Sequence, residues 1–147
     1  MSVAGLAEIV LWTHDMDAAL HFYRDLFGLE VISSPALPNK FLRAGPGAHG
    51  VPEMIVLIPH PDATASFPPE KAKRVLHHLA FRVDAAAYEE LHRRFEAEGI
   101  EVRGGVHPVL KGVRTFYLDD SDGNECECIT YDPGHPEATK TGYDSGA

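Results

Sequence analysis

Residues 8–31, EIVLWTHDMDAALHFYRDLFGLEV, contain an apolar strand, an acidic helix start, an amphipathic helix and a second strand in close succession. Residues 78–102, HLAFRVDAAAYEELHRRFEAEGIEV, repeat that order 70 to 71 residues later. In each copy the apolar residues of the predicted helix recur every three or four positions, which is typical of a helix that buries one face. Asp15 and Asp84 are the predicted N-caps, and a glycine follows each helix. The pattern therefore predicts two copies of one structural unit.

Short strand-like segments, separated by turn residues, follow each predicted helix. Each copy is thereby predicted to be a βαβββ module of the α+β class, with modules at about residues 6–58 and 75–131 of a single domain spanning 1–147. The proline-rich segment 59–74 is the predicted linker. Residues 132–147, rich in glycine, proline and small polar residues, form a tail that is expected to be poorly ordered unless it docks. The expected later strands are Glu30–Ser33, Lys40–Arg43, Glu53–Ile58, Glu101–Arg103, Val113–Asp119 and Glu125–Tyr131.

Composition limits the possible partners. The chain has 13 basic and 22 acidic residues, a net charge of −9, and no block of five like charges. This balance argues against nucleic acid or an anionic membrane and favours a small neutral or cationic molecule, or a metal ion. The sequence has no apolar run of membrane-spanning length and no signal-peptide pattern, so a cytoplasmic location is expected. Cys126 and Cys128 suit neither a disulfide framework nor a zinc site and are predicted to be reduced core thiols.

Three polar residues interrupt apolar strands: Glu8, His78 and Glu127. Burying a carboxylate costs several kcal/mol unless it is paired or binds a metal, so these two glutamates need partners. Because side chains alternate between the faces of a strand, all three residues are predicted to point away from the helices. The alternative without a metal is a buried ion pair or hydrogen-bonded couple between Glu8 and His78. By the same alternation, His77 is expected to face the helices in a structural role.

The paired modules resemble the vicinal oxygen chelate superfamily, which includes glyoxalase I, bleomycin-resistance proteins and type I extradiol dioxygenases. The resemblance covers about residues 6–131, and it implies a curved mixed sheet around a cavity with the helices on the outer face. It also implies metal ligands on the first strand of each module and on the last strand. Carried over by position, these are Glu8, His78 and Glu127, which strand alternation also selects. The segments that carry the resemblance are ALHFYRDLFGL (19–29), LHHLAF (76–81) and FYLDDSDGNECE (116–127).

The resemblance also suggests residues beyond the metal ligands. It places Tyr117 at the position of the dioxygenases' active-site tyrosine and His60 near that of their acid/base histidine. For these two residues the plain alternatives are a half-buried sheet aromatic and a surface-loop histidine. Val10, Trp12 and Arg82 are predicted to line the substrate cavity because they share strand faces with the predicted ligands.

The resemblance implies an enzyme that depends on one divalent metal ion, with Fe, Mn, Ni or Zn as candidates. Such an ion would chelate two neighbouring oxygens of a small substrate during a lyase- or isomerase-type proton transfer, with Glu8 or Glu127 as the general base. Two alternatives stay open: an Fe(II) extradiol dioxygenase, and a metal-free protein that binds a small molecule or antibiotic. Glu8 departs from the dioxygenases' set of two histidines and one carboxylate, since a second carboxylate makes the site formally neutral. Modules of this superfamily also pair between chains, so a homodimer is expected.

Overall fold

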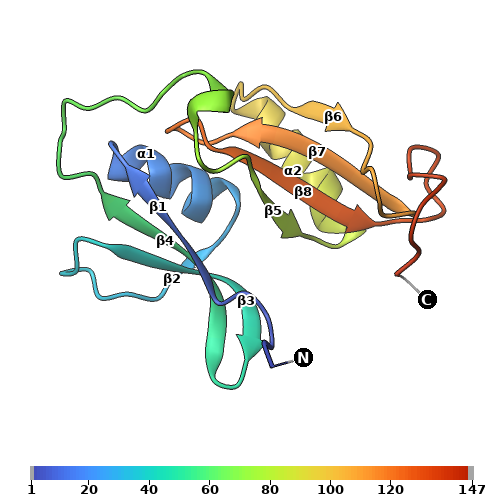
Figure 1. The fold of residues 1–147 in the computed structure, drawn as a ribbon, viewed down its shortest axis with the longest axis horizontal. Coiled ribbons are helices and arrows are strands. Elements are labelled where there is room, and N and C mark those ends of the chain that lie inside the picture. Colours follow the sequence, from blue (N-terminus) through green and yellow to red (C-terminus); the bar gives the residue numbers. More distant parts are fainter. Residues whose placement is uncertain (1, 146–147) are drawn as a thin grey trace. The chain divides into compact units, whose positions relative to one another are not determined.

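The computed structural model describes residues 2–145 and divides between Phe67 and Pro68 into two units (Figure 1). The first unit contains β1 (Glu8–Thr13), α1 (Met16–Leu20), the π-helix η1 (His21–Leu26), β2 (Glu30–Val31), β3 (Lys40–Ala48) and β4 (Val51–Pro59). The second contains the 3-10 turn η2 (Lys71–Lys73), β5 (Leu79–Arg82), α2 (Ala85–Ala97), β6 (Arg103–Gly105), β7 (Val113–Asp119) and β8 (Glu125–Tyr131). Among the described residues, no helix has the length and apolar character needed to cross a membrane.

Each unit contains one four-stranded mixed sheet, and the two sheets have the same topology. The strand orders are β1-β4-β3-β2 and β5-β8-β7-β6. In both, the first strand pairs in parallel with the last strand and the other pairs are antiparallel. The predicted α+β class with two βαβββ modules is therefore confirmed. The register places Leu79 opposite Cys126 and Ala80 opposite Glu127, so the residues just before β5 lie beside the first half of β8.

The helices begin where the sequence predicts. The Asp15 side chain accepts a hydrogen bond from Ala18 N–H (3.0 Å), and the Asp84 side chain accepts one from Ala87 N–H (2.8 Å). Such N-caps satisfy backbone donors that lack an intrahelical acceptor. α2 buries Tyr88, Leu91 and Phe95, as its apolar spacing predicts.

The helix of the first unit changes character at His21, where α1 passes into the π-helix η1. A π-helical turn contains an additional residue, so neighbouring positions can face the same side. Phe22 and Tyr23 are 3% and 0% exposed, and their rings meet edge to face at 4.8 Å. Both aromatic side chains therefore enter the core, although a regular helix directs adjacent residues apart.

β7 and β8 separate the core of the second unit from its polar face. Phe116 and Leu118 are buried on the helix side, where Phe116 contacts the Tyr88 ring at 4.9 Å. Cys126 and Cys128 are fully buried thiols, as predicted, and burial raises the pKa of Cys128 to about 12. Because strand residues alternate, Thr115, Tyr117, Glu125 and Glu127 lie on the opposite face, where the candidate site forms.

The segment after β8 docks on the second unit. Thr139 N–H donates to the Val113 carbonyl (2.9 Å), and Gly112 N–H donates to the Thr139 carbonyl (2.8 Å). Arg114 is only 8% exposed and holds this segment by charge. Its ion pairs are with Glu89 (2.5 Å), Asp132 (3.4 Å) and Glu137 (3.4 Å). These contacts supply the docking on which the order of the tail was predicted to depend.

Candidate functional site

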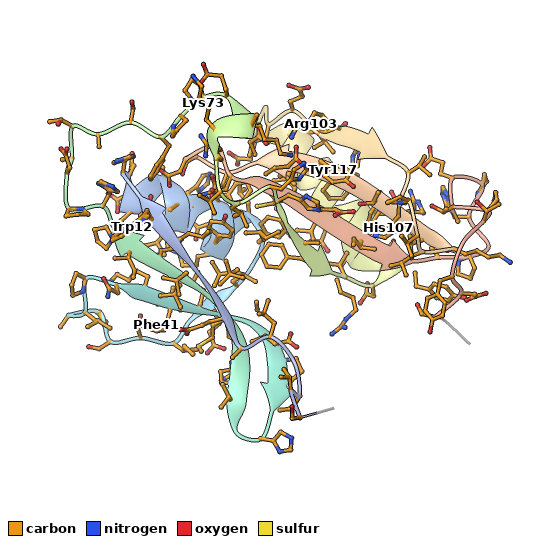
Figure 2. The ribbon with its side chains drawn as sticks, in the orientation of Figure 1. Trp12, Phe41, Lys73, Arg103, His107 and Tyr117 are labelled. Atoms are coloured by element: carbon orange, nitrogen blue, oxygen red, sulfur yellow. The ribbon has the colours of Figure 1, made fainter. Side chains whose placement is uncertain are left out.

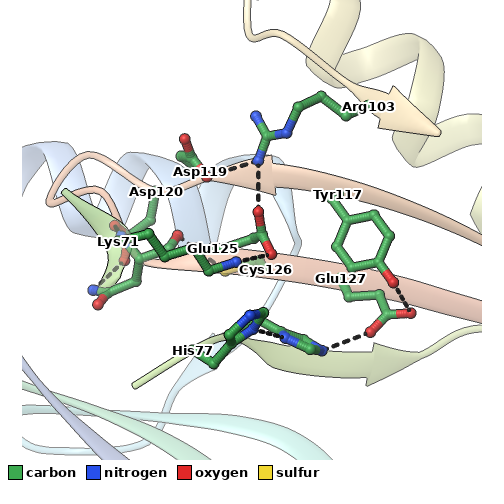
Figure 3. A network of polar contacts seen from close by, with 11 residues as sticks. Lys71, His77, Arg103, Tyr117, Asp119, Asp120, Glu125, Cys126 and Glu127 are labelled. Atoms are coloured by element: carbon green, nitrogen blue, oxygen red, sulfur yellow. Dashed lines mark hydrogen bonds and ion pairs between the residues drawn. The ribbon is translucent and has the colours of Figure 1, made fainter. Parts of the chain in front are cut away.

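Glu127 is a carboxylate buried in the middle of β8, where it is 2% exposed. Its Oε1 accepts hydrogen bonds from the hydroxyls of Thr115 (2.5 Å) and Tyr117 (3.0 Å), as Figure 3 shows for Tyr117. Both donors belong to β7, and the antiparallel register places Tyr117 directly opposite Glu127. A buried carboxylate requires such partners. With Oε1 held by two hydroxyls, Oε2 is the oxygen that faces the next ligand candidate.

That candidate is His78, whose Nε2 lies 3.0 Å from Glu127 Oε2. The His78 side chain is 34% exposed while that of Glu127 is 3% exposed, so the pair connects the interior with the open face of the sheet. Two ligands that each lie about 2.1 Å from one ion, at about 90° to each other, are about 3.0 Å apart. The pair therefore fits two adjacent positions around a six-coordinate ion. The same distance suits a direct hydrogen bond when Nε2 carries a proton.

Tyr117 completes this group, and its ring meets the His78 ring edge to face at 5.8 Å. Burial raises the pKa of Tyr117, and the hydrogen bond to Glu127 and the charge of that carboxylate raise it further. The phenol is therefore a protonated donor at neutral pH. The structure thus brings together three of the residues that the sequence proposes, namely His78, Tyr117 and Glu127.

His77 corrects one sequence-based expectation, because it does not face the helices. It is exposed, and its Nδ1 lies 2.8 Å from Nδ1 of His78. The reason is that β5 begins only at Leu79, so the alternation of strand faces does not extend to residues 77 and 78. His77 is therefore a hydrogen-bond partner of the candidate ligand, with one of the two Nδ1 atoms donating.

A second set of donor atoms, from His77, His78 and Glu125, also lies close enough together to hold an ion, with all three atoms within 4.8 Å of one another. Glu125, however, already pairs with Lys71 and with Arg103 Nη2, the latter at 3.1 Å (Figure 3). Burial alone would raise the pKa of Glu125, but the hydrogen bonds from Lys71 and Arg103 outweigh it and lower the pKa. A dication would have to compete with two cations for this carboxylate. The pair of His78 and Glu127 is therefore the better candidate for a metal centre.

The first unit carries four of the other predicted site residues. Glu8, Val10 and Trp12 lie on the exposed face of β1, where Val10 is 48% and Trp12 50% exposed. This agrees with the predicted alternation, because Leu11 and Thr13 are buried on the other face. Figure 2 labels the Trp12 side chain. His60 follows β4, and its ring lies 5.2 Å from that of Trp12.

The remaining predicted residue, Arg82, ends β5 in the second unit and is exposed. Thr115 is a site residue that the sequence analysis missed. Its position two residues before Tyr117 on the same strand face was the available signal. Arg103 was not predicted as a site residue, because the sequence places it at the end of a strand, whereas β6 begins at this residue.

The chain is similar to a known protein family and to solved structures. A family model described as the Glyoxalase/Bleomycin resistance protein/Dioxygenase superfamily matches residues 5–128. The solved structure of lactoylglutathione lyase from Agrobacterium tumefaciens is 26% identical, with a TM-score of 0.62, and the match covers 88% of this chain and 96% of that one. No curated protein matches the chain.

Two further solved structures share the fold. The domain described as glyoxylase/bleomycin resistance protein/dioxygenase from Frankia sp. EAN1pec is 20% identical, with a TM-score of 0.67, over 92% of this chain and 98% of that one. The fosfomycin resistance protein FosX from Listeria monocytogenes is 22% identical, with a TM-score of 0.60, over 87% of this chain and 93% of that one. At these identities the likeness shows the fold alone.

Proposed function

This chain belongs to the glyoxalase/bleomycin resistance/dioxygenase superfamily, and on that premise we propose that it is a divalent-metal-dependent enzyme. Its proposed reaction is a lyase- or isomerase-type proton transfer on a small substrate that has two neighbouring oxygens. The observation that carries the proposal is the pair of His78 Nε2 and Glu127 Oε2, 3.0 Å apart at a buried carboxylate. Glu8 is the third proposed ligand, by its position in the resemblance.

The donor set of one imidazole and two carboxylates suits Fe(II), Mn(II), Ni(II) or Zn(II). Such an ion, when bound, would hold the two substrate oxygens and stabilise negative charge that develops on them. For His78 to offer Nε2, its ring hydrogen must be on Nδ1, which then donates to Nδ1 of His77 at 2.8 Å. His77 would in this way hold the His78 ring in the required tautomer.

The two glutamates differ in their freedom to move. Glu127 is 2% exposed and is held by Thr115, Tyr117 and His78, so it is suited to a fixed position. Glu8 lies on the exposed face of β1. We therefore assign Glu127 the role of permanent ligand and Glu8 that of the ligand which, loosened from the ion, would act as the general base and remove a proton from the substrate carbon.

The test is metal content and metal affinity. Protein purified without a histidine tag is expected to carry about one divalent ion per chain by elemental analysis. After removal of that ion, calorimetric titration with Mn(II), Ni(II) or Zn(II) should show strong loss of affinity in Glu127→Gln and in Glu8→Gln. Glu125→Gln is the matched control, because Glu125 lies on the same strand face but already pairs with two cations.

The outcomes separate the possible sites. If Glu125→Gln abolishes metal binding and Glu127→Gln does not, the ion is held by His77, His78 and Glu125, and the assignment to Glu127 is wrong. Protein that is purified without metal and binds none of the added ions contradicts the proposed enzyme. Circular dichroism of each variant shows whether a loss of affinity comes from unfolding.

A metal-free ligand-binding protein is the second candidate, and the exposed indole of Trp12 favours it. A flat or cationic ligand can stack on such a ring, and Val10 extends the apolar surface on the same strand face. In that case ligand binding would quench Trp12 fluorescence equally with and without chelator. The dioxygenase alternative would require oxygen uptake with a catechol and Fe(II). The homodimer, the small-molecule partner and the cytoplasmic location remain predictions.

A further inference from the structure

A pocket of about 210 Å³ lies in the second unit, beside the candidate metal ligands. His77, which contacts His78, forms part of its wall. Although the whole chain has a net charge of −9, the pocket wall contains three cations and two carboxylates. These charged side chains are Lys71, Arg74, Arg103, Asp119 and Glu125.

Arg74 is fixed in this wall by uncharged acceptors. Its Nε donates to the Pro68 carbonyl (2.8 Å) and its Nη1 donates to the Asp122 carbonyl (3.1 Å). These bonds orient the guanidinium without neutralising its charge. Among the described residues they are the hydrogen bonds that the Arg74 side chain donates, so Nη2 keeps its donors for another acceptor.

Gly123 provides the space that the Arg74 guanidinium needs. A Cβ atom at position 123 would lie 2.6 Å from Arg74 Nη2, and the residue has a φ of +81° that favours glycine. The turn between β7 and β8 is therefore built so that the guanidinium can lie against it. An arginine that is already oriented loses little conformational freedom when it binds a ligand.

The other two cations are directed at Glu125. Lys71 forms an ion pair with this carboxylate, and Arg103 contacts Asp119 (2.8 Å) and Glu125 (3.1 Å) through Nη2 (Figure 3). Lys71 and Arg103 thus balance Glu125 and Asp119, so the remaining positive charge of the pocket wall is that of Arg74. Within residues 2–145, Arg103 makes its ion pairs through Nη2, and Nε and Nη1 remain for further acceptors.

We propose that this pocket is an oxyanion subsite, in which Arg74 binds a phosphate, phosphonate or carboxylate group while Lys71 and Arg103 balance the charges of Glu125 and Asp119. A planar guanidinium matches the oxygens of such a group. Pockets for whole drug-sized ligands have volumes of roughly 300–1,000 Å³, so this smaller pocket suits one end of a ligand. As a substrate subsite it rests on the proposed function, because its neighbour His78 is a proposed metal ligand. Anion binding itself requires no metal.

The experiment titrates full-length protein, kept metal-free with a chelator, with inorganic phosphate and separately with acetate at constant ionic strength. NMR follows the Arg74 Nε–H and the Gly123 backbone N–H. We expect saturable shifts at both groups in the millimolar range. Arg74→Gln is expected to weaken binding at least about tenfold, since it removes a charge-assisted hydrogen bond. Phosphate binding with little response to acetate would identify a phosphate-type subsite, and the reverse a carboxylate subsite.

Lys73→Gln is the matched control. Lys73 is a neighbouring cation in η2 (Figure 2). It pairs with Glu70 at 3.3 Å and is not among the residues that line the pocket. Lys73→Gln removes the same single positive charge as Arg74→Gln, but outside the pocket. Phosphate binding should therefore stay within about twofold of that of the original protein. Arg74→Lys keeps the charge but loses the planar donor group, and is expected to fall between the two. Because it preserves charge, Arg74→Lys also tests the proposal if Arg74→Gln fails to fold.

Equal weakening by Arg74→Gln and Lys73→Gln would overturn the subsite, because the binding would then report net charge alone. Absence of saturable shifts with both anions would overturn it as well. A failure of the proposed function is distinguishable, because it would appear as lost or absent metal binding while phosphate binding in the chelated protein persists.

Discussion

Thr115→Val is expected to destabilise the protein by removing one hydrogen bond to a buried carboxylate while nearly preserving side-chain shape. Thr115 is 4% exposed, and its Oγ1 lies 2.5 Å from Oε1 of Glu127, which is 2% exposed. Hydrogen bonds to charged groups contribute about 1.5–3 kcal/mol, so the free energy of unfolding should fall by that amount. At roughly 3–4 °C per kcal/mol for a chain of this size, Tm should fall by roughly 5–12 °C.

Thr130→Val provides the control with the same chemical change. Thr130 is 1% exposed on β8, and its Oγ1 has no hydrogen-bond partner among residues 2–145. Removing a buried hydroxyl without a partner should leave stability unchanged or raise it by up to about 1 kcal/mol. Urea unfolding of the metal-free proteins at pH 7, followed by circular dichroism, measures both variants. If they agree within about 0.5 kcal/mol, the hydrogen bond to Glu127 does not contribute as the geometry indicates.

Under the proposed function, the same substitution has a second consequence. Loss of the Thr115 hydroxyl leaves Tyr117 as the one remaining hydroxyl donor to Oε1, so the Glu127 carboxylate is held less firmly with Oε2 toward His78. Partners of metal ligands typically contribute 10- to 100-fold in affinity, and a loss of about tenfold is expected here. Unchanged affinity in a folded Thr115→Val protein would show that Thr115 acts on stability alone.

Three further predictions concern the second unit. Arg114→Met should lower the free energy of unfolding by about 1–3 kcal/mol, which is less than for a fully buried ion pair because the carboxylates are partly exposed. Limited proteolysis of this variant should then cleave the segment after β8. Gly112→Ala should cost about 1–3 kcal/mol in urea unfolding, because φ is +79° and the new Cβ would lie 2.7 Å from the Tyr131 ring. The pKa values of Glu89 and Glu125 are lowered in the folded protein, so the unfolded chain binds protons first as the pH falls. The stability that both groups contribute is therefore present above pH 4.5, their ordinary pKa, and is lost as the pH falls through their pKa values in the folded protein. Urea unfolding between pH 6 and 3 measures this acid dependence, which Glu125→Gln should make less steep.

Local patterns in the sequence were sufficient for the modules but not for every strand. The N-caps and helix periodicity depend on residues a few positions apart, which is why they were predicted correctly. The β3–β4 hairpin is longer than predicted, because the glycine-rich residues 44–50 continue the pairing through irregular register instead of ending it. The carboxylate of Glu53 occupies the space where Gly45 would carry a Cβ. That accommodation depends on the partner strand and cannot be read from the local pattern.

In the candidate site, too, local patterns predict some features and fail for others. Strand alternation correctly placed Glu127 on the face away from the helix, since it lies within a regular strand, whereas Tyr117 was proposed from the resemblance. It failed for His77, which lies before its strand begins. The contact between Arg74 and the turn at Asp122 joins residues 48 positions apart, and no local pattern predicts it.

The docked segment after β8 has a practical consequence for where the protein can be cut. The family match ends at residue 128, inside β8, yet the backbone pairing of this unit extends to Tyr143, whose N–H donates to the Val109 carbonyl at 2.7 Å. A fragment trimmed to the family match would lose two of the three carboxylates that surround Arg114, leaving Glu89. The shortest fragment expected to keep the second unit intact therefore ends after Tyr143, and a purification tag at this end needs a spacer beyond that residue.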